Sequence, residues 1–512
     1  MRTLSIRWHR WLAIVGGTGL LLWGGSGLLH PIMATWGPQQ AVFFPPSRPL
    51  DLTGAQPIHE VLARAGIGAA AAVRIVAGED RNLLQVTENP DAPRRYFRLD
   101  DGAELPDHDR AHAVFLARHY LQEAAAVRAV EWIDEFSPAY PWVNRLLPVY
   151  KVSFERPDDL SIYIYTETNA AAGVDNRFKS VLQTGFRWFH TWSWFPAEAE
   201  WARVVLMALL VGSLLALALT GVTMLVSIRR KQWAPGIRGW HRIAGYALAL
   251  PLLMLTSSGL FHLVQYAAVP PAANLRLSPP VSLDGVSFPL HEQWAELSAG
   301  LEVSTVSIVE IPAEISANTS NNVSTNTSTG RHLYRLGLAP ARNAAPGTPS
   351  EIRNARFDGV ERTGPALYLD AATGEPFAGG DREIALQLGE RFTGVPRTAI
   401  ASAELVTRFG PQYDFRNKRL PVWRLDYGAP VNATIFVDTT TGVLADRTPD
   451  YAKAEQFSFS YLHKWNFLFP LGREAQNGIV SAAVIASMLF MAGIGLTLDI
   501  RRRKRKTRRD RA

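Results

Sequence analysis

The sequence of 512 residues contains no cysteine. This absence excludes a disulfide framework, cysteine-ligated zinc, iron–sulfur clusters and covalent c-type haem attachment. Charged residues are also scarce, at 19%, whereas hydrophobic residues reach 47%, a balance poor in charge for a soluble protein. No strand-bound GxGxxG motif occurs, because Gly17-Thr18-Gly19 lies inside an apolar run. We therefore expect no Rossmann-type NAD or flavin site, and histidine is the natural ligand for any redox centre.

Four apolar runs are long enough to cross a membrane, which takes about 20 mostly apolar residues. They cover residues 11–33, 202–228, 243–264 and 479–500. The first run follows a basic start, as a signal peptide does. It is too long for a signal-peptide core, contains two tryptophans and precedes no small-x-small cleavage site. We interpret it as a retained span.

Basic residues cluster before the first run, between the second and third runs, and after the fourth. By the positive-inside rule, we expect both termini and the short loop to lie on the cytoplasmic side of the membrane. The basic tail suits lipid headgroups better than nucleic acid, because it directly follows a span. The expected organisation is 1–33 for the N-terminus and first span, 34–198 for an outer domain, 199–231 for the second span, 232–264 for the loop and third span, 265–476 for another outer domain, 477–500 for the fourth span and 501–512 for the tail.

Histidines mark an internal repeat in the chain. The first and third runs carry a histidine at each end, with the same spacing of 21 residues. A second shared pattern, Phe-x-x-x-His-x-Trp, precedes the second and fourth runs. Span, domain and span thus occur twice in parallel, an arrangement that places binding sites at the interface between repeats. The repeated histidines are His9, His30, His190, His241, His262 and His463.

The two outer domains are predicted to be α+β, which makes the whole chain an α-helical membrane protein with α+β domains. Alternating apolar residues predict strands at 147–154, 160–165, 366–370, 420–427 and 433–438. Helices are expected at 109–124 and 381–388. The tract 316–329, rich in Ser, Thr and Asn, and the segment 341–350 read as flexible loop within an insertion of about 316–350. His108, His112 and His119 share a helix face, which we interpret as a solvated face rather than a metal site.

Ionisable groups inside membrane spans are costly and usually functional. Neutral imidazole is a good axial ligand for haem iron, and two facing helices can each supply one. We therefore expect two bis-histidine haem centres, one at each membrane face. His9 and His241 form the cytoplasmic pair, and Arg10 and Arg242 are candidates for the haem carboxylates. The outer pair stays open between His30 with His262, which share a helix face, and His190 with His463, which share the richer motif.

The histidine motifs of the chain resemble those of the PepSY-associated transmembrane proteins. The motifs are His9–Trp11, Phe189–Trp192, His241–Gly245 and Leu462–Arg473. The strand pair that ends at Val437–Gly442 is similar to a PepSY module. The resemblance covers nearly the whole chain. It implies a haem b-containing ferric-siderophore reductase of the inner membrane, with four recurring histidines. These are His9, His190, His241 and His463; His30 and His262 are additions to the family pattern.

Two hypotheses follow for the function. In the first, the chain is an oxidoreductase that carries electrons across the membrane to a ferric siderophore, and a quinol or a separate reductase is the donor. In the second, the chain is haem-free, and its outer domains bind a peptide, a siderophore or a protein partner. A transporter is a weaker third possibility, because the spans number only four and carry no acidic residue near mid-membrane.

Overall fold

The computed structural model of the protein describes residues 2–227, 236–268, 280–311, 331–338, 346–348, 351–352, 354–355, 366–410, 412–413, 415–417 and 419–511. The chain divides into two compact units. The helical unit comprises Met1–Pro38, Asn176–Pro271 and Tyr451–Ala512, and the sheet unit comprises Gln39–Asp175 and Ala272–Asp450. Most of the predicted loop tracts at 316–329 and 341–350 lie outside the described residues.

Four helices in the described part of the chain are long and apolar enough to cross a membrane. They confirm that the four predicted runs are helical. Large apolar side chains such as Trp201, Leu250 and Leu489 are more than half exposed on these helices, as a lipid-facing surface requires. The candidate spans are Leu4–Trp36, Ala197–Ser227, Ile237–Ala268 and Arg473–Arg505.

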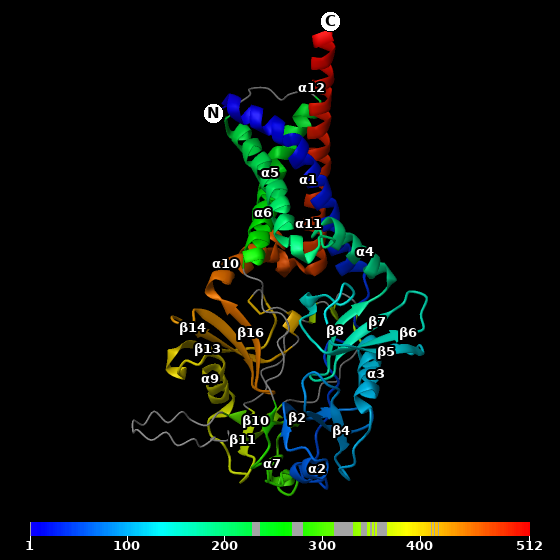
Figure 1. Ribbon diagram of the computed structural model, residues 1–512, viewed down its shortest axis with the longest axis vertical. Coiled ribbons are helices and arrows are strands. Elements are labelled where there is room, and N and C mark those ends of the chain that lie inside the picture. The colour runs from blue at the N-terminus through cyan, green and yellow to red at the C-terminus, as the bar shows by residue number, and fades with distance from the viewer. Residues whose placement is uncertain are drawn as a thin grey trace. The chain divides into compact units, whose positions relative to one another are not determined.

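The four long helices form a bundle in which α1 and α6 lie diagonally opposite each other (Figure 1). Helix α1 (Arg2–Trp36) packs on α5 (Glu200–Ser227), and α5 packs on α6 (Ile237–Ala268). The fourth helix packs on both α1 and α6. It consists of α11 (Arg473–Ala486), the π-helical segment η7 (Ser487–Gly493) and α12 (Ile494–Arg511).

A shorter helical segment precedes both α5 and α11. Helix α4 (Arg177–Phe189) begins where the side chain of Asn176 accepts a hydrogen bond from the Lys179 amide, and it packs on α1. The segment before α11 consists of α10 (Asp450–Ser458), the π-helical η5 (Phe459–His463) and η6 (Asn466–Leu471). The corresponding short element before α5 is η2 (Ala197–Ala199).

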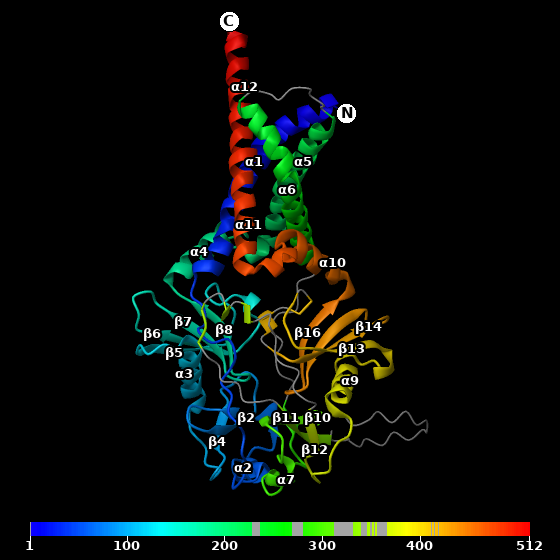
Figure 2. The same ribbon diagram turned by 180° about the vertical axis from the view of Figure 1, so that it is seen from behind.

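A six-stranded antiparallel sheet forms the base of the sheet unit, in the order β12-β11-β10-β2-β3-β4 (Figure 2). We expected two outer domains, in residues 34–198 and 265–476; strand β2 of the first segment pairs with β10 of the second, with Val73 opposite Ile308 and Arg74 opposite Ser307. Of the strands in this sheet, only β12 was predicted from the sequence, at 366–370. Their bounds are β2 (Ala72–Ala77), β3 (Asn82–Thr87), β4 (Arg95–Arg98), β10 (Val303–Ile311), β11 (Arg331–Leu338) and β12 (Leu367–Asp370).

Two further four-stranded antiparallel sheets each carry one helix. The first has the order β5-β6-β7-β8 with α3 against it, and the second has the order β13-β14-β15-β16 with α9. They include both predicted helices and four of the five predicted strands; the fifth, at 366–370, is β12 of the six-stranded sheet. The bounds are α3 (His108–Leu121), β5 (Val127–Ile133), β6 (Val149–Phe154), β7 (Ser161–Tyr165), β8 (Ala170–Asp175), α9 (Gly380–Thr393), β13 (Ile400–Val406), β14 (Val422–Tyr427), β15 (Ala433–Asp438) and β16 (Val443–Pro449).

Gly374 follows β12 and Gly442 follows β15, with φ values of +77° and +67°, which glycine adopts without steric cost. The remaining described elements of the sheet unit are short. They are α2 (Ile58–Arg64), β1 (Ala69–Ala70), η1 (Trp142–Asn144), β9 (Val281–Ser282), α7 (Trp294–Leu297), η3 (Arg397–Ala399) and η4 (Phe415–Asn417).

Candidate functional site

At one end of the bundle, His9 of α1 and His241 of α6 face each other. Their ring centroids are 6.4 Å apart, and the ring planes are inclined by 59°. The two helices occupy diagonal positions, so these side chains meet across the centre of the bundle. The structure therefore brings together the two residues that the sequence predicts as the cytoplasmic pair.

Backbone carbonyls orient both of these rings. Nδ1 of His9 lies 3.2 Å from the Leu217 carbonyl oxygen, and Nδ1 of His241 lies 3.1 Å from that of Phe490. A carbonyl oxygen only accepts, so each Nδ1 must carry the proton and each Nε2 keeps its lone pair. Phe490 belongs to η7, whose π-helical geometry departs from the regular α-helical bonding pattern. Both rings are held in the tautomer that binds a metal through Nε2.

At the other end of the bundle, serine hydroxyls hold His190 and His463 in the same way. Nδ1 of His190 lies 3.2 Å from Oγ of Ser26, and Nδ1 of His463 lies 3.2 Å from Oγ of Ser258. Each hydroxyl donates its own proton to a carbonyl in the preceding helical turn, at 2.8 Å for Ser26 and 2.7 Å for Ser258. Each serine must therefore accept from the histidine, which leaves Nε2 of both rings with a lone pair.

Burial also keeps His190 and His463 neutral. It lowers the pKa of His190 to about 4, and the proximity of His30 adds to the effect. Burial lowers the pKa of His463 to about 3, with further contributions from His190 and His262. Near neutral pH both imidazoles are uncharged, which is the form that ligates metals.

A glycine lies against the Cε1 atom of all four of these rings. A Cβ atom at Gly221 would be 3.3 Å from Cε1 of His9, and one at Gly27 would be 3.4 Å from Cε1 of His190. The corresponding distances are 3.3 Å for Gly495 and His241, and 3.6 Å for Gly259 and His463. A Cβ at Gly221 or Gly495 would therefore be closer than an ordinary van der Waals contact, whereas one at Gly27 or Gly259 would just touch the ring.

His30 and His262 have different surroundings. The ring of His30 lies 6.0 Å from that of Phe186, tilted by 54°. Nδ1 of His262 is 2.6 Å from Oε1 of Glu455, and its ring stacks on Phe459 at 4.2 Å. Neither contact involves a glycine, which the other four histidines share, or a serine, which His190 and His463 share, so the structure sets His190 and His463 apart from this pair.

The two candidate arginines, Arg10 and Arg242, directly follow His9 and His241 in the sequence. Arg10 is exposed on α1. The guanidinium of Arg242 lies over the ring of Tyr246, 5.8 Å from the centroid, and its Nη2 donates to the tyrosine hydroxyl at 3.2 Å.

The histidine face of α3 is packed, so the solvated face that we expected is wrong. His112 is only 1% exposed, and its Nε2 is 2.9 Å from Oδ1 of Asn169. Nε2 of His119 lies 3.0 Å from the carbonyl oxygen of Phe44, to which it donates. His108 packs edge-on against Tyr96. Within the described ranges, no group of three or more histidine, aspartate or glutamate side chains is arranged as a metal site.

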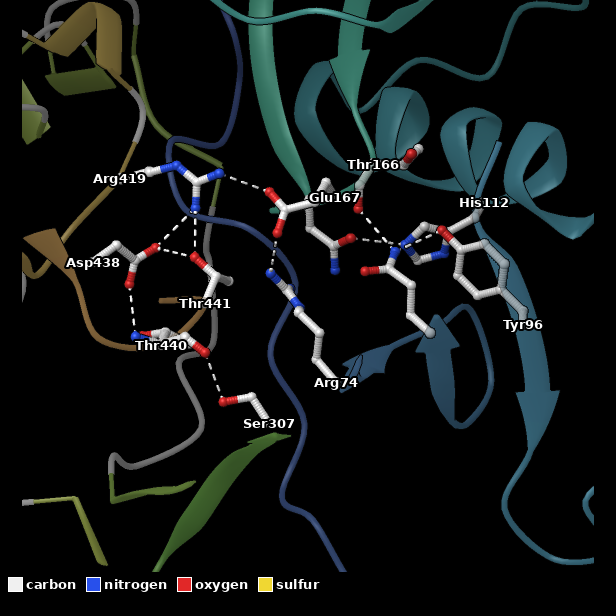
Figure 3. Close-up of polar contacts among 12 residues, drawn as sticks. Arg74, Tyr96, His112, Thr166, Glu167, Ser307, Arg419, Asp438, Thr440 and Thr441 are labelled. Atoms are coloured by element: carbon white, nitrogen blue, oxygen red, sulfur yellow. Dashed lines mark hydrogen bonds and ion pairs between the residues drawn. The ribbon is translucent and has the colours of Figure 1, made fainter. Parts of the chain in front are cut away.

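A buried network of charges links the two chain segments of the sheet unit (Figure 3). Arg419 donates to Glu167 of the β7–β8 turn and to Asp438, at 2.8 Å each. Arg74 of β2 lies 3.6 Å from the same glutamate, whose side chain is fully buried. Burial would raise the pKa of Asp438, but the guanidinium of Arg419 holds it below its usual value. Ser307 of β10 joins the network by donating to the carbonyl of Thr440 at 2.7 Å.

Several residues of the site were not predicted, although the repeat could have indicated some of them. Ser26-Gly27 and Ser258-Gly259 have the same spacing from each other as His9 and His241. Phe186 and Phe459 each begin the shared Phe-x-x-x-His motif and stack on its histidine, at 4.6 and 4.8 Å. Glu455 has no acidic counterpart in the first half, so no repeated pattern marks it.

The fold and the site define a protein with four candidate membrane spans and six histidines near the two ends of one helix bundle. No protein-family model matches the chain, and it has no match among curated proteins.

Proposed function

We propose that the protein is a haem b-containing reductase of the PepSY-associated transmembrane family. It would pass electrons across the bacterial inner membrane to a ferric siderophore on the outer side, with both termini in the cytoplasm. The observation that carries this proposal is the shared environment of four histidines at two ends of one bundle. Each has an oxygen at Nδ1 and a glycine at Cε1.

We also infer that the chain arose by duplication and that its sheets are PepSY-like modules. The two four-stranded sheets have the same strand order, and each is preceded by a helix. The Tyr96 hydroxyl donates to Asp109 of α3, and the Tyr368 hydroxyl donates to Asp381 of α9. Such matching interior contacts are expected of two copies of one module.

The histidines fit a haem on three counts. An imidazole–metal bond of about 2 Å places the centroids of two axial rings on one ion roughly 6 Å apart, close to the 6.4 Å between His9 and His241. The Nε2 atoms keep their lone pairs, and a chain without cysteine has no c-type thioether attachment, which favours haem b held by histidine. When bound at each level, haem would supply one-electron redox chemistry. The chain's own part is to fix the tautomer, orient the rings and limit access of water.

For the outer centre we propose His190 and His463 as the ligands. The alternative pair, His30 and His262, lacks the shared serine and glycine contacts. Arg10 and Arg242 would meet haem carboxylates at the inner face, where charge-assisted hydrogen bonds are strong.

The proposed product is Fe(II). The ferric siderophore accepts one electron, and the hard oxygen ligands typical of siderophores hold Fe(II) much more weakly than Fe(III). Iron is then released on the outer side for uptake. The electron donor is a quinol or a separate reductase.

The test is a spectrum of the detergent-purified protein, air-oxidised and then dithionite-reduced, with a pyridine haemochrome count. We expect a b-type reduced band and two haems per chain. His9→Ala or His241→Ala should remove one spectral component, and His190→Ala or His463→Ala the other. His59→Ala, in α2 of the sheet unit, is the matched control and should change neither. Adding a ferric siderophore to the reduced protein should reoxidise it and yield Fe(II).

A featureless visible spectrum after expression with ample haem would overturn the haem assignment. It would favour the second candidate function, a haem-free membrane protein whose outer domains bind a peptide, a siderophore or a protein partner. The outer haem could instead lose its spectral component in His30→Ala and His262→Ala and keep it in His190→Ala and His463→Ala. That result would make His30 and His262 the outer ligands.

A further inference from the structure

The outer ends of the two halves differ at one acidic residue. In the second half, His262 hydrogen-bonds Oε1 of Glu455 at 2.6 Å. The glutamate side chain is 14% exposed and the histidine 40%. Glu455 stands four residues before the phenylalanine of the shared motif, and the matching position in the first half is Leu182. The carboxylate is thus specific to the second half.

The same half also contains a continuous stack of three rings. His262 stacks on Phe459 with centroids 4.2 Å apart and planes at 22°, and Phe459 stacks on His463 at 4.8 Å and 15°. In the first half, Phe186 stacks on His190 at 4.6 Å and 18°, but His30 is tilted by 54° at 6.0 Å. Glu455 therefore holds the outermost ring of a stack that ends on a proposed haem ligand.

We propose that Glu455 is a positioning residue that fixes His262 over Phe459 and lowers the reduction potential of the outer haem. The inference rests on the proposed function. A negative charge near a haem stabilises the more positive, oxidised state, and low dielectric surroundings strengthen the effect. Replacing the Glu455 carboxylate by an amide subtracts one negative charge from this cluster. Outer-shell hydrogen bonding is an established means of tuning haem.

This difference between the halves has a functional use. Ferric siderophores bind Fe(III) so tightly that they are difficult to reduce, so the centre that serves them must be a strong reductant. A carboxylate at the outer cluster makes that centre more reducing. The described residues include no matching carboxylate contact at the inner pair, where the Nδ1 atoms meet carbonyls and the Thr220 hydroxyl.

The test is an equilibrium redox titration of the full-length purified protein, followed by the visible absorbance of its b-type components. The variants are wild type, Glu455→Gln and Glu200→Gln. Glu200 forms an ion pair with Arg203 in α5 and is half exposed, so its replacement removes one negative charge without touching the stack. The component that persists in His241→Ala identifies the outer haem.

We expect Glu455→Gln to move only the outer component to a more positive potential. At a fixed potential near its midpoint, the ratio of reduced to oxidised outer haem should rise roughly tenfold, which corresponds to a few kT of electrostatic energy. Glu200→Gln should superimpose on wild type. An unchanged titration of Glu455→Gln, or an equal shift in both variants, would overturn the inference. A wild-type protein without haem would instead mean that the proposed function had failed.

Discussion

The chemistry available to a histidine depends on what its second ring nitrogen contacts. In this protein four histidines direct Nδ1 to an oxygen from a neighbouring helix or turn. In each case that oxygen must accept the hydrogen bond, so Nδ1 carries the proton and Nε2 keeps its lone pair. The oxygens differ, because His9 and His241 use carbonyls and His190 and His463 use serine hydroxyls. The same ring state is therefore reached by two different means.

Gly27 should be required for the placement of His190. Valine at this position would put a branched side chain where a single Cβ already lies 3.4 Å from the ring. We expect Gly27→Val to lower the proposed count of two haems per chain toward one, measured by pyridine haemochrome. Gly25→Val is the control, because a Cβ there meets nothing within 4 Å. Equal haem loss in both variants would point to a general effect on α1.

Glu167 should be important for the stability of the sheet unit. Its removal leaves the guanidinium of Arg419, only 5% exposed, without one of its two carboxylates. Breaking a buried ion pair in this way costs about 3–5 kcal/mol, so Glu167→Ala should lower the midpoint of chemical denaturation substantially. The exposed pair between Glu131 and Lys151 provides the control, since Glu131→Ala should cost less than about 1 kcal/mol. Similar midpoints for both variants would contradict the expectation.

At the scale of elements, helices and strands with a regular pattern of apolar residues could be predicted from the sequence. Local irregularities within them could not. The four spans and the strands β6, β7, β14 and β15 follow from length and alternation in the sequence. The π-helical turns η5 and η7 could not be predicted, because their residues also suit an ordinary α-helix. The strands β2 and β10 were not predicted, and burial does not account for this, because the predicted β7 and β15 are buried at every position. The histidines of α3 were misread, since a polar residue inside a packed helix looks like one on a solvated face.

The π-helical turn η7 should be needed at the inner pair. Deleting Leu489, which is 60% exposed, would let the segment return to regular α-helix. The Phe490 carbonyl would then bond within the helix, and Gly495 would rotate away from His241. We expect loss of the inner b-type component in the reduced spectrum. Leu489→Ala keeps the chain length and should retain that component; if the deletion also retained it, η7 would have no such role.

At the scale of the whole molecule, the two halves of the sequence build one sheet together. The six-stranded sheet takes three strands from each half and joins them at β2 and β10. The buried charges of Arg74, Glu167 and Arg419 link the same two segments. The repeat predicted two copies, but it could not show that they share one sheet, because strand pairing between distant segments leaves no local pattern.

The absence of native cysteine offers a direct check of this pairing. Val73 and Ile308 lie opposite each other in the register of β2 and β10, and paired residues have the Cα separation that a disulfide needs. We expect Val73→Cys with Ile308→Cys to form an internal disulfide, detected as a non-reducing link between fragments after proteolysis between residues 175 and 280. The pair Val76→Cys with Ile308→Cys, three residues out of register, should not cross-link. The reverse result would reject the register.

The pairing of β2 with β10 also affects how the protein folds during synthesis, because β2 leaves the ribosome long before its partner strand. More than 200 residues, including two long apolar helices, separate Arg74 from Ser307 in the chain. At about 5–20 residues per second, the ribosome needs on the order of ten to fifty seconds to make that interval. Throughout this delay β2 has an unpaired edge, and such edges readily pair with other chains. The nascent protein therefore passes through a period in which a holding chaperone, or rapid capture by its own second half, determines whether it assembles or aggregates.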